Sequence, residues 1–380
     1  MPVLITIISI IFSFLSKFNK TKKRQVPDKE DKQKREASYP DPYPNGWFNV
    51  CTSKDVKKGK VIEVEAFGQK LAVFRGENGE IGVFDIFCPH LNANLADGRV
   101  EGNNLVCPFH GWQFKNNGQC AHIPYSEGKP PSQAKVKTWE AIEAWGLILV
   151  WHHAKGLAPE WNPQNYLPEL EKYKYHGYTD DVLHIHLQDF AENGADYAHF
   201  NFVHNLLTIP YADRFVHIQH DVKIEFGEED KKHLAWFTDT ANLHWNKSGE
   251  QIKDAGGNAL VRYFGPGFLI FKLNSKLAKE VTIVKTFTPI APLKLKMEDH
   301  IFAPKGTNRF ALKYVLEEAS EQFHDDILIW ERKGYATHPI LVKEDGPIMQ
   351  MRKWYSQFYS NKPNVKRVKK VDNEELITAN

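Results

Sequence analysis

Two short loops, each carrying one cysteine and one histidine, constrain the fold of this chain more than any other feature. Cys88-Pro-His90 is followed, after sixteen intervening residues, by Cys107-Pro-Phe-His110. Each loop offers one sulfur and one imidazole nitrogen, so the pair makes a four-ligand metal site. Only four cysteines occur in 380 residues, which is too few for a disulfide scaffold. The fold must therefore bring these two loops together around a metal.

The order of the ligands distinguishes two kinds of site. Zinc fingers usually keep their cysteines together and their histidines together, whereas each loop here mixes the two. The mixed order favours a Rieske [2Fe–2S] cluster, in which one iron takes two thiolates and the other two imidazoles. Gly111 and Trp112 suit a backbone that approaches the cluster and an apolar wall that screens it. A structural zinc site is the alternative. Cys51 and Cys120 are predicted to be buried small apolar residues.

Composition and strand patterns predict a large α+β protein with two domains. Apolar residues make up 42% of the chain, and 49 basic against 47 acidic residues give a net charge of +2, which argues against a nucleic-acid partner. A compact antiparallel β domain is expected over 45–156 and a catalytic α+β domain over 157–360. Helical patterns cover 191–206 and 308–333. Strands are predicted at 61–67, 71–74, 81–87, 147–151, 182–187, 222–226, 235–240, 268–273 and 281–288.

The N-terminal segment has its own pattern. Residues 1–16 carry no charged side chain, and residues 17–36 hold nine basic and four acidic ones. A short apolar run followed by Lys and Arg predicts a membrane anchor over 1–18, with the rest of the chain on the cytoplasmic side. The alternatives are a signal peptide, a transit peptide and an apolar N-terminal segment that has no targeting function. Residues 19–44 read as a charged linker, and residues 361–380 as a solvated tail.

A second group of histidines lies in Asp196-Tyr-Ala-His199-Phe-Asn-Phe-Val-His204. Five steps along a regular helix turn the two imidazoles about 140° apart, so they can share one ion only if the helix ends between them. Histidines alone are more often surface or hydrogen-bonded core residues than ligands. Beside a redox cluster, however, two histidines and a carboxylate indicate the facial triad of non-haem Fe(II). Asp196, three residues before His199, could hold the imidazole N–H.

The third ligand must come from a distant part of the chain. An acidic pair opens an otherwise apolar helical stretch at Asp325-Asp326, and Glu331 follows. A carboxylate that faces a core is costly unless it is paired or bound to a metal. Asp325, Asp326 and Glu331 are all candidates on this argument, although either aspartate could instead favour the helix dipole.

These residues together resemble the Rieske non-haem iron oxygenases over nearly all of 45–355, most closely the sterol C7-desaturase (Neverland) subgroup. The segments 123–153, 184–204 and 325–359 carry that likeness. The resemblance implies a [2Fe–2S] cluster on Cys88, His90, Cys107 and His110, and a mononuclear iron on His199, His204 and Asp326. It further implies a helix-grip catalytic domain, Asn193 near the iron, and Asp196 bridging the two centres across a subunit boundary of a head-to-tail homotrimer. Asn92 departs from the subgroup, which more often has glycine there.

The resemblance also implies an activity. Cholesterol would be oxidised by O2 to 7-dehydrocholesterol at the endoplasmic reticulum membrane, and steroid or lipid hydroxylation is the alternative. No Gly-rich dinucleotide fingerprint follows a strand, so a separate NAD(P)H-dependent reductase is expected. The aromatic and aliphatic run 263–271 could line a sterol pocket or simply pack in the core. An electron carrier without a catalytic iron and a zinc-stabilised domain are rival interpretations.

Overall fold

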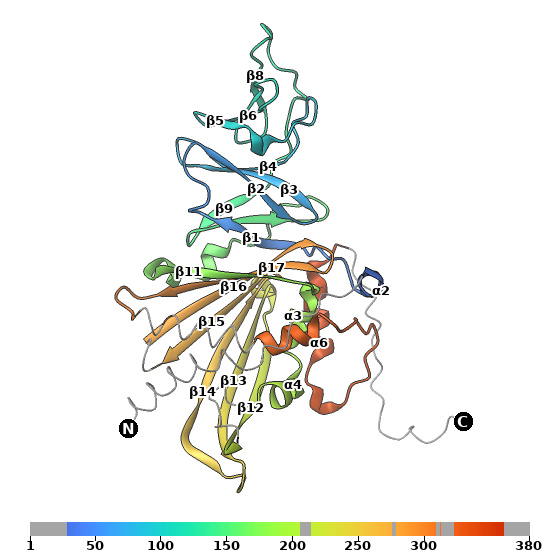
Figure 1. Ribbon diagram of the computed structural model, residues 1–380, viewed down its shortest axis with the longest axis vertical. Coiled ribbons are helices and arrows are strands. Elements are labelled where there is room, and N and C mark those ends of the chain that lie inside the picture. The colour runs from blue at the N-terminus through green and yellow to red at the C-terminus, as the bar shows by residue number, and fades with distance from the viewer. Residues whose placement is uncertain (1–28, 206–213, 276–278, 309–311, 313–322, 361–380) are drawn as a thin grey trace, which may run out of the picture.

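The computed structural model of the chain describes residues 29–205, 214–275, 279–308, 312 and 323–360. Small β-sheets form one end of the long axis, and a broad sheet with helices on one side forms the other (Figure 1). The predicted anchor over 1–18 and the predicted tail over 361–380 lie outside the described residues. Within the described ranges, no helix is both long enough and apolar enough to cross a membrane.

Three antiparallel sheets build the first domain, as its alternating apolar runs and tight turns predict. Their strands, in order within each sheet, are β1 (Gly46–Thr52), β10 (Leu147–His152) and β9 (Ala141–Ala144); β2 (Lys60–Ala66), β3 (Gln69–Arg75) and β4 (Ile81–Asp85); and β5 (Arg99–Glu101), β6 (Asn104–Val106), β7 (Gln113–Phe114) and β8 (Cys120–His122). One Cys/His loop follows β4 and the other joins β6 to β7. Both therefore lie at the outer tip of the molecule (Figure 1).

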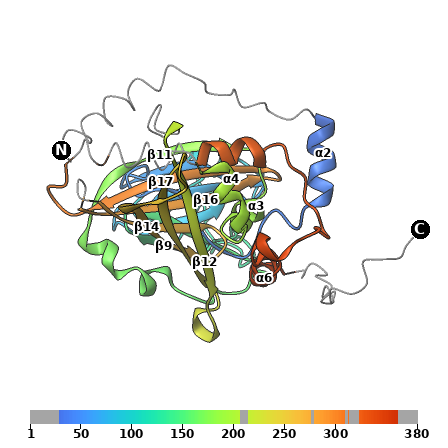
Figure 2. The same ribbon diagram turned by 90° about the horizontal axis from the view of Figure 1, so that it is seen from below.

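A seven-stranded antiparallel sheet forms the second domain. Its strand order is β11 (Lys174–Leu183), β17 (Lys294–Ala303), β16 (Lys279–Ala291), β15 (Phe268–Ser275), β14 (Gln251–Phe264), β13 (Leu234–Trp245) and β12 (Val216–Phe226). Helices gather on one side of this sheet, as Figures 1 and 2 show. They are α3 (Leu187–Asn193), α4 (Tyr197–Val203), a helix over 323–330 and α6 (Ile348–Tyr355). The predicted α+β class with a central antiparallel sheet is confirmed.

The two domains share one hydrophobic core. Phe48 and Val50 of β1 belong to the same buried cluster as Phe287 of β16. The backbone N–H of Phe67 donates to Pro289 O at 2.7 Å, and Asn49 Nδ2 donates to Glu298 Oε2 at 2.6 Å. Because apolar burial crosses the boundary between the sheets, the first domain is fixed on the second.

Several elements differ from the sequence prediction. The strand expected over 182–187 is wrong at its end, because β11 stops at Leu183 and α3 begins at Leu187. Strands β14 and β17 were not predicted. Of the helical pattern over 308–333, only 323–330 is a continuous helix within the described residues. Each of these differences lies beside the second histidine group or in the sheet behind it.

Part of the predicted linker is a packed helix, α2 (Lys29–Ser38). Arg35 is 8% exposed and donates to four backbone carbonyl oxygens, those of Glu331, Trp330, Lys333 and His184, at 2.6, 2.9, 2.9 and 3.3 Å. Residues 29–38 of the predicted charged linker are thus helical and held against the fold by Arg35. The lysines and glutamates of α2 give it a polar composition, and one inward arginine holds it to the fold.

Candidate active site

The two Cys/His loops meet as predicted. Cys88 and Cys107 are buried, 1% and 2% exposed, and belong to one apolar cluster. The rings of His90 and His110 have centroids 4.7 Å apart. The indole of Trp112 stacks on His90 at 4.7 Å, so it forms the expected wall. Two sulfurs thus gather on the inner side and two half-buried imidazoles on the outer side, which is the arrangement a Rieske cluster needs.

The chemistry of these side chains fits the cluster. His90 Nδ1 is buried and has no hydrogen-bond partner among the described residues, so it is free to ligate a metal. Burial raises the pKa of the Cys88 thiol to about 12, so a metal is needed to hold it as the thiolate. Cys51 and Cys120 are buried and unpaired, as predicted.

Backbone conformation explains the residues beside these ligands. Gly111 has φ +72°, and Asn92 has φ +55°. Both values lie in the left-handed region, which glycine adopts freely and asparagine more readily than most other residues. Asn92, the departure from the subgroup pattern, therefore keeps the loop conformation.

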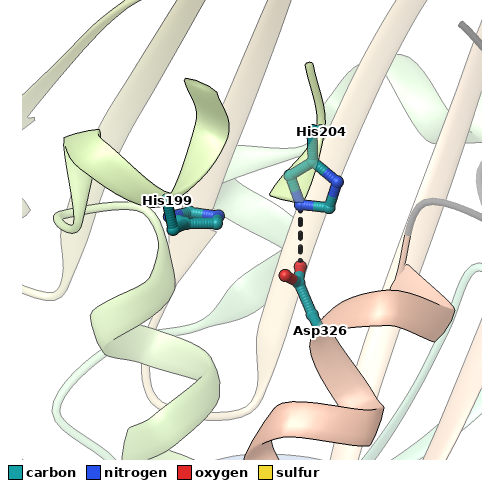
Figure 3. A group of neighbouring side chains, drawn as sticks. All are labelled: His199, His204 and Asp326. Atoms are coloured by element: carbon teal, nitrogen blue, oxygen red, sulfur yellow. Dashed lines mark hydrogen bonds and ion pairs between the residues drawn. The ribbon is translucent and has the colours of Figure 1, made fainter. Parts of the chain in front are cut away.

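The second group of ligands lies between α4 and the helix over 323–330 (Figure 3). Helix α4 ends at Val203, and His204 is its C-cap with φ −109° and ψ 17°. This is the helix end that the five-residue spacing requires, and it lets both imidazoles reach one point. Ligand atoms of His199, His204 and Asp326 all lie within 4.8 Å of one another.

The contacts within this triad suit a shared ion. His204 Nε2 lies 3.2 Å from Asp326 Oδ2, and two adjacent ligands at about 2.1 Å from one ion are about 3 Å apart. His199 Nε2 is buried and has no partner among the described residues. Burial lowers the pKa of His199, which favours the neutral ring that binds metals. Asn193 Nδ2 donates to Asp326 Oδ2 at 3.1 Å, so the predicted neighbour is in place.

The sequence predicts that the Asp196 carboxylate accepts a hydrogen bond from the His199 imidazole, but the backbone carbonyl of Asp196 does so instead. The His199 Nδ1–H donates to the Asp196 backbone carbonyl at 2.5 Å, whereas its carboxylate oxygen is 4.0 Å from that nitrogen. The carboxylate instead caps α4 by accepting the His199 backbone N–H at 3.3 Å. The Asp196 side chain is 41% exposed, so it is open to a second chain.

The structure separates the three carboxylate candidates. Asp325 is exposed and is not part of the group that the two histidines form. Glu331 is buried, but its Oε1 accepts the backbone N–H of His184 at 3.0 Å. Asp326 alone of the three joins His199 and His204, because it is buried and lines the pocket between its helix and the sheet.

An apolar pocket opens beside the triad, and aromatic and aliphatic side chains form most of its wall. His204 and Asp326 form part of its wall. Strand alternation divides the run 263–271: Tyr263, Leu269 and Phe271 line the pocket, whereas Phe264, Phe268 and Ile270 pack in a core on the other face. Alternate residues of this run therefore line the pocket or pack in the core.

The pocket also contains a polar pair that sequence reasoning missed. His220 Nδ1 lies 2.7 Å from Asp239 Oδ2, and His220 Nε2 lies 3.2 Å from the His204 carbonyl oxygen. Burial lowers the pKa of His220, but the hydrogen bond to Asp239 and its charge raise it overall. His220 is in β12 and Asp239 in β13, and the register makes them diagonal neighbours, which spacing along the sequence does not reveal.

Comparison with known proteins agrees with both sites. Residues 46–140 match the Rieske [2Fe-2S] domain, and residues 150–359 match the 3-ketosteroid 9α-hydroxylase C-terminal domain. The cholesterol 7-desaturase nvd of Hemicentrotus pulcherrimus is 38% identical over 92% of this chain and 77% of its own length. The cholesterol 7-desaturase of Caenorhabditis elegans is 32% identical over 87% of this chain and 81% of its own length.

A bacterial relative and solved structures extend the comparison. A probable 3-ketosteroid-9-alpha-monooxygenase oxygenase component from Rhodococcus rhodochrous is 31% identical over 84% of this chain and 81% of its length. Dicamba monooxygenase bound to dicamba has the same fold, with a TM-score of 0.62 and 17% identity over 83% of this chain and 97% of that one. NdmA from Pseudomonas putida CBB5, with caffeine, has a TM-score of 0.60 and 19% identity over 86% of this chain and 91% of that one.

The Rieske match decides between the cluster and zinc in favour of the cluster. The catalytic-domain match excludes a protein that only carries electrons. The chain therefore belongs to the Rieske oxygenases, oxidoreductases with a [2Fe–2S] cluster and a mononuclear iron, within the family of the 3-ketosteroid 9α-hydroxylase C-terminal domain.

Proposed function

We propose that this protein is a sterol desaturase that converts cholesterol to 7-dehydrocholesterol. The C7–C8 bond loses two hydrogen atoms, and O2 is reduced to two water molecules by those hydrogens together with two electrons and two protons. The electrons come from a separate NAD(P)H-dependent reductase. The observation that carries this proposal is the apolar pocket that has His204 and Asp326 in its wall, together with relatives named cholesterol 7-desaturase.

The roles of the residues follow from their contacts. His199, His204 and Asp326 would hold the iron, which supplies O2 activation when it is bound. The Asp196 carbonyl fixes the tautomer of His199, because it accepts the Nδ1–H and directs Nε2 to the metal. Asn193 orients Asp326 through its amide. The aromatic and aliphatic wall binds the sterol skeleton and excludes water.

The electrons are proposed to pass between chains. In one chain, the Cys/His loops lie at the opposite end of the molecule from α4 (Figure 1). Large apolar side chains surround the loops at this tip, namely Phe87, Leu91, Phe109 and Tyr125, each exposed by about 60%. A second pocket reaches the triad from the side of Asp196 and His199, with Ile329 and Leu341 in its lining. We infer that the tip of one copy docks there, with Asp196 between the centres, in a head-to-tail trimer.

Mixing two inactive variants tests transfer between chains. Cys88→Ser removes a cluster ligand, and His199→Ala removes an iron ligand, so each variant alone should be inactive. Co-expressed chains should regain part of the activity, because an intact cluster in one copy can serve an intact iron site in the next. A monomeric mass in solution, or mixed oligomers without activity, would refute this assembly.

Sterol analysis by mass spectrometry tests the reaction. Cells that express the chain and receive cholesterol should accumulate a diene two hydrogens lighter than the substrate, whereas cells with His199→Ala should not. A product one oxygen heavier would favour hydroxylation, which the match to the 3-ketosteroid 9α-hydroxylase domain makes the second candidate. Loaded iron centres with neither product would remove the sterol assignment.

We further propose that residues 1–18 anchor the protein to the endoplasmic reticulum membrane, with the catalytic part in the cytoplasm. The apolar run and the basic residues after it support this placement. A chain without residues 1–18 should move from the microsomal to the soluble fraction. Its retention in microsomes would contradict the anchor.

A further inference from the structure

One carboxylate oxygen in the wall of the apolar pocket accepts no hydrogen bond from the described residues. Asp239 is 9% exposed and lines the pocket, and its Oδ2 is engaged by His220 at 2.7 Å. Its Oδ1 is buried and has no hydrogen-bond partner among the residues that the structure describes. Burial of an acceptor without a donor costs free energy, so such a group indicates a missing partner.

The surroundings of Asp239 restrict what that partner is. Phe237 of the same strand and Val261 of the next strand are buried apolar neighbours in the pocket wall. A ligand that fills this space is therefore mostly hydrocarbon and carries one polar group. A carboxylate oxygen accepts hydrogen bonds and an alcohol donates one, whereas a ketone has no proton to offer.

The position of Asp239 in the same pocket wall as His204 and Asp326 also suits a polycyclic substrate. The His220 imidazole contacts Asp239 Oδ2 and the backbone carbonyl of His204, so one ring links Asp239 to a residue of the triad. A hydroxyl on one ring of a fused ring system can thus meet Asp239 while carbons of the adjacent ring face His204 and Asp326.

We propose that Asp239, held by His220, is the subsite for the substrate's hydroxyl group and makes the pocket select a 3-hydroxysterol over the corresponding 3-ketosteroid. This inference rests on the proposed sterol substrate and adds the basis of its recognition. His220 is a positioning residue, because it occupies Oδ2 and leaves Oδ1 for the ligand. A site built to bind a hydroxyl discriminates strongly against an analogue without one.

Binding of a matched pair of ligands tests the inference. Cholestanol and cholestanone share one skeleton and differ only in the hydroxyl or ketone at C3. The iron-loaded wild type should bind cholestanol about 10- to 100-fold more tightly, as expected for a hydrogen bond to a buried charge. Asp239→Asn should lose that preference, because the amide can donate to a ketone. Asp221→Asn, at an exposed position of β12, is the matched control and should retain it.

The outcomes separate this inference from the proposed function. Equal affinity of the wild type for the two ligands, or an equal loss of both in Asp239→Asn, would overturn the hydroxyl subsite while product formation from cholesterol continued. No binding of either ligand would refute the sterol substrate and the subsite together. The wild-type comparison decides the question even if the variant fails to fold.

Discussion

Arg35 is expected to hold the helix that carries Asp326. Its guanidinium donates to the carbonyl oxygens of Trp330, Glu331 and Lys333, at the C-terminal end of the helix over 323–330. The last carbonyls of a helix generally lack partners within it, and a cation at this end also favours the helix dipole. Arg35→Ala removes these charge-assisted bonds from the end of the helix.

The magnitude follows from the burial of each bond. The bonds to Trp330 and Glu331 are buried, whereas those to Lys333 and His184 are partly open and can be replaced by water. A lost hydrogen bond to a charged group costs about 1.5–3 kcal/mol. The two buried bonds therefore stabilise the helix end by about 3–6 kcal/mol. Because 1.36 kcal/mol is a factor of ten, local opening should become about 10²- to 10⁴-fold more frequent.

Hydrogen–deuterium exchange measures this directly. Amides over 323–333 should lose protection in Arg35→Ala by that factor, whereas those of β13 should keep theirs. Bound mononuclear iron should fall, since Asp326 is on the affected helix, while the cluster stays intact. Lys32→Ala is the control, because Lys32 is exposed and its pair with Glu36 contributes about 0.3–0.5 kcal/mol. Unchanged protection over 323–333 in Arg35→Ala would refute this reasoning.

Three further predictions concern the helices beside the site. Burial lowers the pKa of His186 to about 4 from its ordinary 6.5, so the unfolded chain alone takes up this proton between those values. His186 therefore contributes roughly 3 kcal/mol that is fully present above pH 6.5 and lost as pH falls to 4. His186→Asn keeps an acceptor at the N-cap of α3. Its free energy of unfolding, measured by chemical denaturation, should fall less over that pH range than that of the wild type. An equal fall in both proteins would contradict the assignment. Glu192→Gln breaks the buried pair with Arg352, whose bonds are 2.9 and 3.0 Å long, and should lower the free energy of unfolding by about 3–5 kcal/mol. The control Lys353→Ala, at an exposed position, should lower it by less than about 0.5 kcal/mol. Similar denaturation midpoints for the two variants would argue against this. Gly194→Ala places a methyl group against the Tyr263 hydroxyl, so it should lower the free energy of unfolding by about 1–3 kcal/mol and displace His199. Gly257→Ala is the control, because a methyl group there meets open space. Full iron occupancy in Gly194→Ala would exclude the displacement.

The sequence predicts the candidate metal ligands because the chemistry of such sites restricts them. Two mixed Cys/His loops suit few cofactors, and the five-residue spacing from His199 to His204 works only if a helix ends there. Asp326 could not be separated from Asp325 or Glu331 in the same way. The choice depends on which side of the helix faces the sheet, and on the bond that Glu331 makes to His184.

Other features depend on tertiary pairing and could not be predicted. His220 and Asp239 meet through the register of β12 and β13, which no local pattern specifies. Helix α2 has the composition of a solvated linker, and its place in the fold depends on the contacts of Arg35 with residues almost 300 positions away. Strand β14 contains Gly256-Gly257, which local propensity disfavours, and pairing with β13 at these positions overrides that preference.

Helix α4 links the two sides of the triad. Asp196 caps its beginning and His204 caps its end, so seven residues separate a carboxylate exposed toward one pocket from a ligand in the wall of the other. Asn193 and Asp326 line both pockets. Electrons that arrive on the Asp196 side can therefore reach the metal ligands without passing through the apolar pocket. In the proposed mechanism, a substrate in that pocket meets the same candidate ligands from the other side, and the short helix brings its two caps, Asp196 and His204, to the two approaches.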